Sequence, residues 1–133
     1  MENLQRRESF WHHYWWKFIY FWTSSRNTVC PTGRRLCPFL EQSEEDGYYE
    51  FTRNLAAILQ AYPQPKAVLI GRFPKECQMT QDILIYILDK HPILKTIPVM
   101  YDLDFAHTQP LFTITIGAKA SIDTDSFSIS IRE

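Results

Sequence analysis

Residues 67–102, AVLIGRFPKECQMTQDILIYILDKHPILKTIPVMYD, decide the fold because two short apolar runs flank one segment with helical periodicity. The run at 67–71 ends at a glycine and the run at 98–102 ends at an aspartate, as short buried strands commonly do. Between them, Thr80 is a suitable N-cap for a helix over 81–90. The apolar face of this helix consists of Ile83, Leu84, Ile87 and Leu88. A strand, a helix and a second strand in this order predict one unit of an α/β domain.

The sequence on either side of this unit continues the pattern. Leu36–Glu41 is an apolar run that ends in a carboxylate and predicts another buried strand. Tyr48–Tyr62 has helical spacing and is followed by Pro63 and Pro65, which stop a helix. A polar loop is expected next, over 104–110. Three later segments alternate polar and apolar residues and predict half-buried strands, the last two as a hairpin: Leu111–Ile116, Lys119–Asp123 and Ser126–Arg132. The expected fold is an α/β domain with a mixed sheet.

Composition narrows the class of protein. A chain of 133 residues with 45% hydrophobic residues suits a single domain. The net charge of −1 argues against a protein built to bind nucleic acid, whose binding face is strongly basic. A spanning helix needs about 20 consecutive apolar residues, and no stretch reaches this length without charge or proline. The three cysteines are widely spaced and match neither a disulfide framework nor a zinc site, so we expect a reducing cytoplasm.

Residues 1–38 differ from the rest because nine of the twenty aromatic residues lie between Phe10 and Trp22. One interpretation is an interfacial membrane anchor, because tryptophan and tyrosine favour membrane interfaces. In a helix, however, these aromatics would fall on all sides and leave no polar face. A signal peptide is the second interpretation, although its apolar region would contain His12, His13 and Lys17, with no cleavage site after it. Those adjacent histidines also lack a carboxylate or cysteine at the spacing of a metal site.

A third interpretation of the aromatic segment follows from the genetic code, because tryptophan has a single codon, TGG. Read one nucleotide later, Trp11 to Trp22 encodes glycine, three Ile or Thr positions, and then a stretch compatible with Gly-Gly-Asn-Leu. The sequence therefore predicts that Trp11–Pro38 is translated out of frame between two compensating slips. On this interpretation residues 1–38 have no independent fold, and residues 39–133 form the domain.

Few residues are candidates for chemistry. The sequence contains no P-loop, no dinucleotide-binding glycine motif, no G-x-S-x-G elbow and no H-E-x-x-H motif. His107 lies in a polar loop directly after a predicted buried strand, where site residues are commonly displayed, although many loop histidines are simply surface residues. Glu41 ends another predicted strand. A histidine that acts as a base needs such a carboxylate to fix its tautomer and stabilise its protonated form.

Four sequence blocks in order resemble the C-terminal domain of the LD-carboxypeptidases, which include muramoyl-tetrapeptide carboxypeptidases and microcin self-immunity peptidases. The blocks are Phe39-Leu-Glu-Gln-Ser-Glu-Glu45, Val68-Leu-Ile-Gly-Arg-Phe73, Pro98-Val-Met-Tyr-Asp-Leu-Asp-Phe-Ala-His-Thr-Gln-Pro110 and Leu111-Phe-Thr-Ile-Thr-Ile-Gly117. The resemblance implies a swivelling β/β/α-type domain. It also implies that Glu41 and His107 belong to a Ser–Glu–His triad. Ala106 stands where the family usually has glycine.

The resemblance also implies a function and its limits. Family members are serine peptidases whose nucleophile lies in a separate N-terminal domain, so we expect these residues to be inactive alone. The implied substrate is a peptide with a free carboxylate, such as a murein tetrapeptide or a peptidyl-nucleotide conjugate. Arg72 could lie near that carboxylate, although a solvated arginine is the more ordinary interpretation. No metal or organic cofactor is required. The implied partners are a separate N-terminal half or a second copy, and the alternative function is a truncated, non-catalytic interaction module.

Overall fold

A four-stranded parallel sheet forms the centre of the computed structural model, which describes residues 14–16, 18–22, 36–105, 112–115, 119–123, 125–126 and 128–132. Its strand order is β2-β3-β4-β5, so neighbours in the sequence are neighbours in the sheet. The strands are β2 (Phe18–Trp22), β3 (Leu36–Leu40), β4 (Val68–Gly71) and β5 (Val99–Leu103). Each pair is parallel, which confirms an α/β domain with a parallel sheet.

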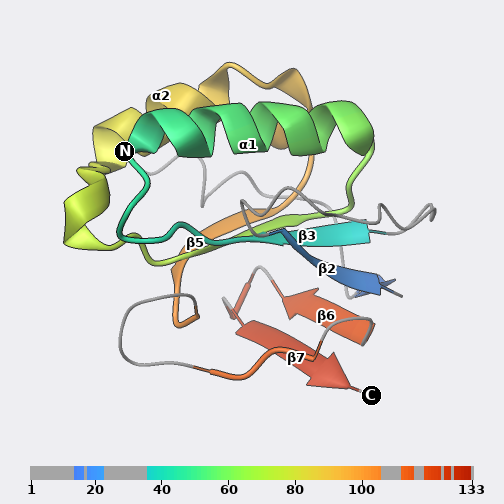
Figure 1. Ribbon diagram of the computed structural model, residues 1–133. Helices are drawn as coiled ribbons and strands as arrows, with labels where there is room; N and C mark the ends of the chain where they lie inside the picture. Colours follow the sequence, from blue (N-terminus) through green and yellow to red (C-terminus); the bar gives the residue numbers. More distant parts are fainter. Residues whose placement is uncertain are drawn as a thin grey trace.

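Two helices, α1 (Tyr48–Ala61) and α2 (Gln81–Asp89), connect successive strands and lie on the same face of this sheet (Figure 1). Thr80 caps α2 as expected, because its Oγ1 accepts a hydrogen bond from the backbone N–H of Ile83 at 3.2 Å. Short 3-10 turns follow β4 at Lys75–Cys77 and α2 at Pro92–Lys95. The apolar faces of both helices pack on one face of the sheet in a cluster that includes Phe51, Leu55, Ile58, Leu84, Leu88, Val68 and Ile70.

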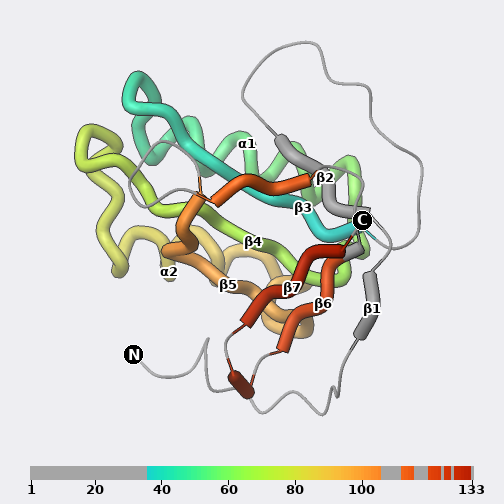
Figure 2. Tube along the Cα trace, turned by 90° about the horizontal axis from the view of Figure 1, so that it is seen from below, coloured from blue at the N-terminus to red at the C-terminus, as the bar shows by residue number. Residues whose placement is uncertain are grey.

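A second, antiparallel sheet covers the opposite face of the parallel sheet. It has the order β1-β6-β7, with β1 (Tyr14–Trp16), β6 (Lys119–Asp123) and β7 (Ser128–Arg132). Seen from below, β6 and β7 cross in front of the parallel sheet while the helices lie behind it (Figure 2). A second apolar cluster joins the two sheets through Cys37, Phe39, Ala67, Leu69, Phe105, Ala120 and Ile122. The domain is therefore layered as helices, parallel sheet and antiparallel sheet.

The layering explains why β3 and β4 are apolar throughout. Successive strand residues face opposite sides of a sheet, and both sides are covered here. Phe39 accordingly belongs to the cluster beneath the sheet, whereas Leu40 belongs to the cluster beneath the helices. In the antiparallel layer only one face is covered, so Ser128, Ser130 and Arg132 are exposed and the isoleucines between them are half-buried.

One sequence expectation differs from the structure. The strand expected over Leu111–Ile116 is wrong for residues 112–115, which are in no strand. Phe112 and Ile114 share the parity expected of one buried face, yet Phe112 is exposed and only Ile114 packs on the lower cluster. Alternation alone therefore did not create a strand here, since no neighbouring strand pairs with these residues. Within residues 1–38 the structure describes β1 and β2, whose backbones pair with β6 and β3, respectively.

Candidate active site at the carboxyl edge of the parallel sheet

The polar residues of interest follow the carboxyl ends of three adjacent strands. Leu40 is paired with Ile70, and Gly71 is paired with Leu103. Glu41, Arg72 and Asp104 therefore leave the sheet at one edge, directly after β3, β4 and β5. Neighbouring strands are about 4.8 Å apart, so the ends of β3 and β5 are separated by about 10 Å. This edge is where open α/β sheets usually bind ligands.

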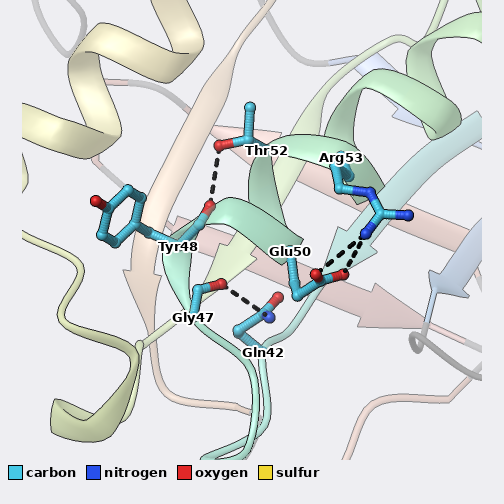
Figure 3. A network of polar contacts seen from close by, with 6 residues as sticks. All are labelled: Gln42, Gly47, Tyr48, Glu50, Thr52 and Arg53. Atoms are coloured by element: carbon cyan, nitrogen blue, oxygen red, sulfur yellow. Dashed lines mark hydrogen bonds and ion pairs between the residues drawn. The ribbon is translucent and has the colours of Figure 1, made fainter.

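The turn that follows Glu41 is held by buried polar contacts. Gln42 is only 2% exposed, and its amide Nε2 donates a hydrogen bond to the carbonyl of Gly47 at 3.5 Å (Figure 3). Gly47 precedes α1 as its N-cap, so this contact ties the turn to the start of the helix. The thiol of Cys77, which is buried, donates to the carbonyl of Ser43 at 3.1 Å. Glu41, which is half-buried, thus lies between a sheet strand and a fixed turn.

Burial and the carboxylates of Asp46 and Glu76 raise the pKa of the Cys77 thiol. A raised pKa leaves little thiolate at neutral pH, and the thiolate is the reactive form of cysteine. Cys77 therefore has the environment of a structural residue. Among the residues that the structure describes, no group of three or more His, Cys, Asp or Glu side chains could hold a metal ion.

Phe105 connects the end of β5 with the end of β3. Its ring packs edge-on against Phe39, with ring centroids 5.1 Å apart and planes at 60°. Between these two strands Phe105 also crosses Gly71, where an added Cβ would lie 2.8 Å from the Phe105 carbonyl oxygen and 2.9 Å from its ring. Only glycine permits so close an approach. The chain that leaves β5 is therefore directed back across β4 towards β3.

Arg72 fastens the same segment by polar contacts. Its guanidinium Nε donates to Asp102 at 3.1 Å and its Nη2 donates to Asp104 at 2.5 Å. Its backbone N–H donates to the carbonyl of Leu103 at 3.0 Å. The hydrogen bond to Asp102 is the largest influence that raises the pKa of Arg72 above its usual range, and Asp104 adds to it. The sequence interpretation of Arg72 as solvated, or as a ligand for a substrate carboxylate, missed these two ion-pair partners.

An irregularity in β5 brings the two aspartates to Arg72. The register between β4 and β5 shifts by one residue between Leu69 and Gly71, which places an extra residue in β5. Asp102 lies within this bulge in the left-handed conformation, with φ of 62°. Aspartate tolerates this conformation better than most residues, and bulges often redirect side chains next to functional sites. The sequence placed Asp102 at the end of the predicted strand 98–102, whereas β5 continues to Leu103.

Of the two predicted site residues, the structure describes Glu41 and not His107. Glu41 is at the carboxyl edge of β3, two residues after Phe39. His107 and Ala106 lie outside the described residues, and so do His12, His13 and Cys30. Phe105, two residues before His107, is the last described residue of that segment, and Phe112 returns to it with a backbone hydrogen bond from its N–H to the Asp104 carbonyl at 2.8 Å.

Comparison with known proteins supplies the family. The sequence model of the LD-carboxypeptidase C-terminal domain matches residues 24–122. This chain therefore belongs to the LD-carboxypeptidase family and comprises its C-terminal domain. The match begins within residues 1–38, ahead of the boundary expected from the sequence. No helix in the described ranges has the length and apolarity to cross a membrane.

Individual relatives agree with this assignment. The chain is 28% identical over 104 residues to a carboxypeptidase-type protein of Treponema pallidum (strain Nichols), covering 77% of this chain and 31% of that protein. It is 32% identical over 88 residues to the carboxypeptidase-type protein YocD of Bacillus subtilis (strain 168), covering 62% of this chain and 27% of that protein. It is 28% identical over 101 residues to the microcin C7 self-immunity protein MccF of Escherichia coli, covering 71% of this chain and 28% of that protein. The chain thus spans less than a third of each relative's length.

A solved structure supports the fold. The structure of MccF in complex with aspartyl sulfamoyl adenosine matches with a TM-score of 0.51 at 23% identity. The match covers 74% of this chain and 30% of that one. At this identity the similarity establishes the mixed α/β fold of the domain and its parallel sheet.

Proposed function

We propose that this domain supplies the base and its orienting carboxylate to a serine-type LD-carboxypeptidase. In this proposal His107 takes the proton from a serine hydroxyl of a nucleophile domain and returns it to the leaving amine. Glu41 accepts a hydrogen bond from the second ring nitrogen of His107, which fixes the tautomer and stabilises the imidazolium form. The domain is then of the swivelling β/β/α type that the sequence resemblance implies.

The contact between Phe39 and Phe105 carries this proposal. Glu41 follows Phe39 by two residues, and His107 follows Phe105 by two residues. The two rings lie 5.1 Å apart in the lower cluster, although 66 residues separate them in the sequence. Residues i and i+2 of an extended chain face the same side. In this proposal, a chain directed from β5 over Gly71 towards β3 brings His107 to the side on which Glu41 begins its turn.

The family and its relatives support the substrate class. The matching family is that of the LD-carboxypeptidases, and the solved structure of MccF is a complex with aspartyl sulfamoyl adenosine. We propose that the complete site accepts a peptide with a free carboxylate, either a murein tetrapeptide or a peptidyl-nucleotide conjugate. These 133 residues by themselves release no terminal D-alanine from a murein tetrapeptide, because serine nucleophile and oxyanion donors belong to the other domain in this family.

An NMR titration of the His107 ring tests the pairing directly. A carboxylate partner favours the protonated ring, so His107 titrates above the ordinary histidine value of about 6.5. Glu41→Gln lowers that pKa by about 1 unit. Glu50→Gln is the matched control, since Glu50 is a half-exposed glutamate on α1 whose partner is Arg53 at 3.2 Å. An unchanged titration in Glu41→Gln refutes the proposed pair. Such a result leaves the interaction module as the remaining function.

A further inference from the structure

The pair formed by Gly71 and Arg72 holds four consecutive residues of the segment that leaves β5. Arg72 binds the Asp102 carboxylate through its side chain, the Leu103 carbonyl through its backbone and the Asp104 carboxylate through its side chain. Phe105 then lies on Gly71, with no room for a Cβ between them. Every contact in this set joins the carboxyl end of β4 to residues about 30 positions later in the chain.

These ion pairs differ from an ordinary surface salt bridge, which contributes little because one flexible side chain meets another in water. Arg53 and Glu50 form such a pair, with 76% of the Arg53 side chain exposed and both residues on α1. The Arg72 side chain is 32% exposed, and the side chains of its partners Asp104 and Asp102 are 37% and 67% exposed. The difference lies in the geometry, because one guanidinium bridges two carboxylates with different nitrogens of one rigid plane. The bulge and the left-handed conformation of Asp102 place both aspartates within its reach.

We propose that Arg72 is a positioning residue of the active site: its clamp on Asp102 and Asp104 fixes the segment that delivers His107 to Glu41. This role rests on the proposed function, since it assumes that His107 pairs with Glu41. The guanidinium touches neither the substrate nor the reacting atoms in this role. It acts through Asp104, which is three residues before His107. Loss of the clamp leaves the domain folded and separates the base from its carboxylate.

Two opposite effects on His107 make the proposal testable. If Arg72 acts only through its charge, its removal raises the pKa of His107, because a nearby positive charge disfavours the imidazolium. If Arg72 positions the loop, its removal separates His107 from Glu41 and lowers the pKa towards about 6.5. The sign of the change therefore distinguishes a positioning role from a purely electrostatic one.

The experiment is an NMR titration of the His107 ring in the 133-residue chain, with the resonance assigned by its loss in His107→Gln. We expect Arg72→Met to lower the pKa of His107 by about 1 unit, as Glu41→Gln does. In the Glu41→Gln background, Arg72→Met then has no further lowering effect, because the two changes remove the same contact. Arg53→Met is the matched control and leaves the titration unchanged.

A second variant covers loss of folding in Arg72→Met. Arg72→Lys keeps the charge but offers one ammonium in place of the planar fork, so it cannot bridge both aspartates. We expect a smaller lowering of the His107 pKa in Arg72→Lys than in Arg72→Met. The clamp is refuted if Arg72→Lys titrates like the wild type, or if Arg72→Met raises the pKa, while Glu41→Gln still lowers it. If Glu41→Gln itself has no effect, the proposed function fails instead.

Discussion

Substitution of Gly71 by alanine should destabilise the domain by about 2 kcal/mol, within the range of about 1–3 kcal/mol for overpacking a filled interior. The new Cβ would lie 2.8 Å from the Phe105 carbonyl oxygen and 2.9 and 3.0 Å from two of its ring carbons. A ring can turn, but the carbonyl belongs to the backbone and moves only with the chain. For a domain of this size, the loss corresponds to a melting temperature lower by roughly 8 °C.

Urea unfolding followed by circular dichroism measures this difference, and Gly47→Ala provides the control. A Cβ at Gly47 meets nothing within 4 Å, so the same chemical change has room there. Alanine is a poorer N-cap than glycine, but Gly→Ala also reduces the entropy of the unfolded chain. These effects oppose each other, so we expect Gly47→Ala to change the free energy of unfolding by less than about 0.5 kcal/mol. Phe105→Leu should relieve the ring contact in Gly71→Ala and leave the carbonyl contact in place. Equal stabilities for the two alanine variants would refute the role of Gly71 as the crossing point of the chain.

Three further predictions concern stability. Leu55→Ala removes a fully buried side chain between α1 and the sheet, and should lower the free energy of unfolding by about 3 kcal/mol in urea titrations. Thr80→Ala removes the cap of α2 and should cost about 1 kcal/mol in the same measurement, whereas Thr80→Ser should retain most of the stability. Burial, with a smaller contribution from the charge of Lys90, lowers the pKa of His91. Below about pH 6.5 the unfolded chain therefore binds more protons than the folded domain. The contribution of neutral His91 to stability is complete above that pH and is lost as the pH falls through the lowered pKa of His91. His91→Gln should flatten this decline, and a wild-type acid dependence in that variant would contradict the assignment.

Local patterns were sufficient to predict most of the regular elements. The helix expected at Tyr48–Tyr62 ends one residue earlier, at Ala61, and the cap of α2 was identified from Thr80 alone. Helices with one apolar face and short apolar strands between turn residues carry their signal in nearby positions. The hairpin of β6 and β7 was also predicted from the sequence. In the structure, the Asp123 side chain closes its turn by accepting a hydrogen bond from the backbone N–H of Asp125 at 2.9 Å.

Features that depend on distant residues were not predictable in this way. Residues 112–115 alternate like a strand, but a strand also needs a partner, and alternation carries no information about pairing. The ion pairs of Arg72 join positions 30 and 32 residues apart, so no local pattern indicates them. Glu41 was identified from its place at the end of a predicted strand and then from the family resemblance, and its pairing with His107 stays a prediction. The out-of-frame origin of Trp11–Pro38 also stays a prediction. The DNA that encodes residues 8–41 tests it, because the shifted frame must encode the glycine-glycine-asparagine segment.

The antiparallel layer has a consequence for biosynthesis. Residues of β6 and β7 leave the ribosome after every other described element, yet Ala120 and Ile122 cover the lower faces of β3 and β4. Until they emerge, the nascent chain presents Phe39 and Leu69 to the surrounding water, and exposed apolar surface of this kind promotes aggregation. The strand β1 is affected as well, because its partner among the described strands is β6, which is synthesised much later. Synthesis that stops after β5 thus leaves a chain whose lower apolar cluster is uncovered, which is the form that chaperones and proteases recognise.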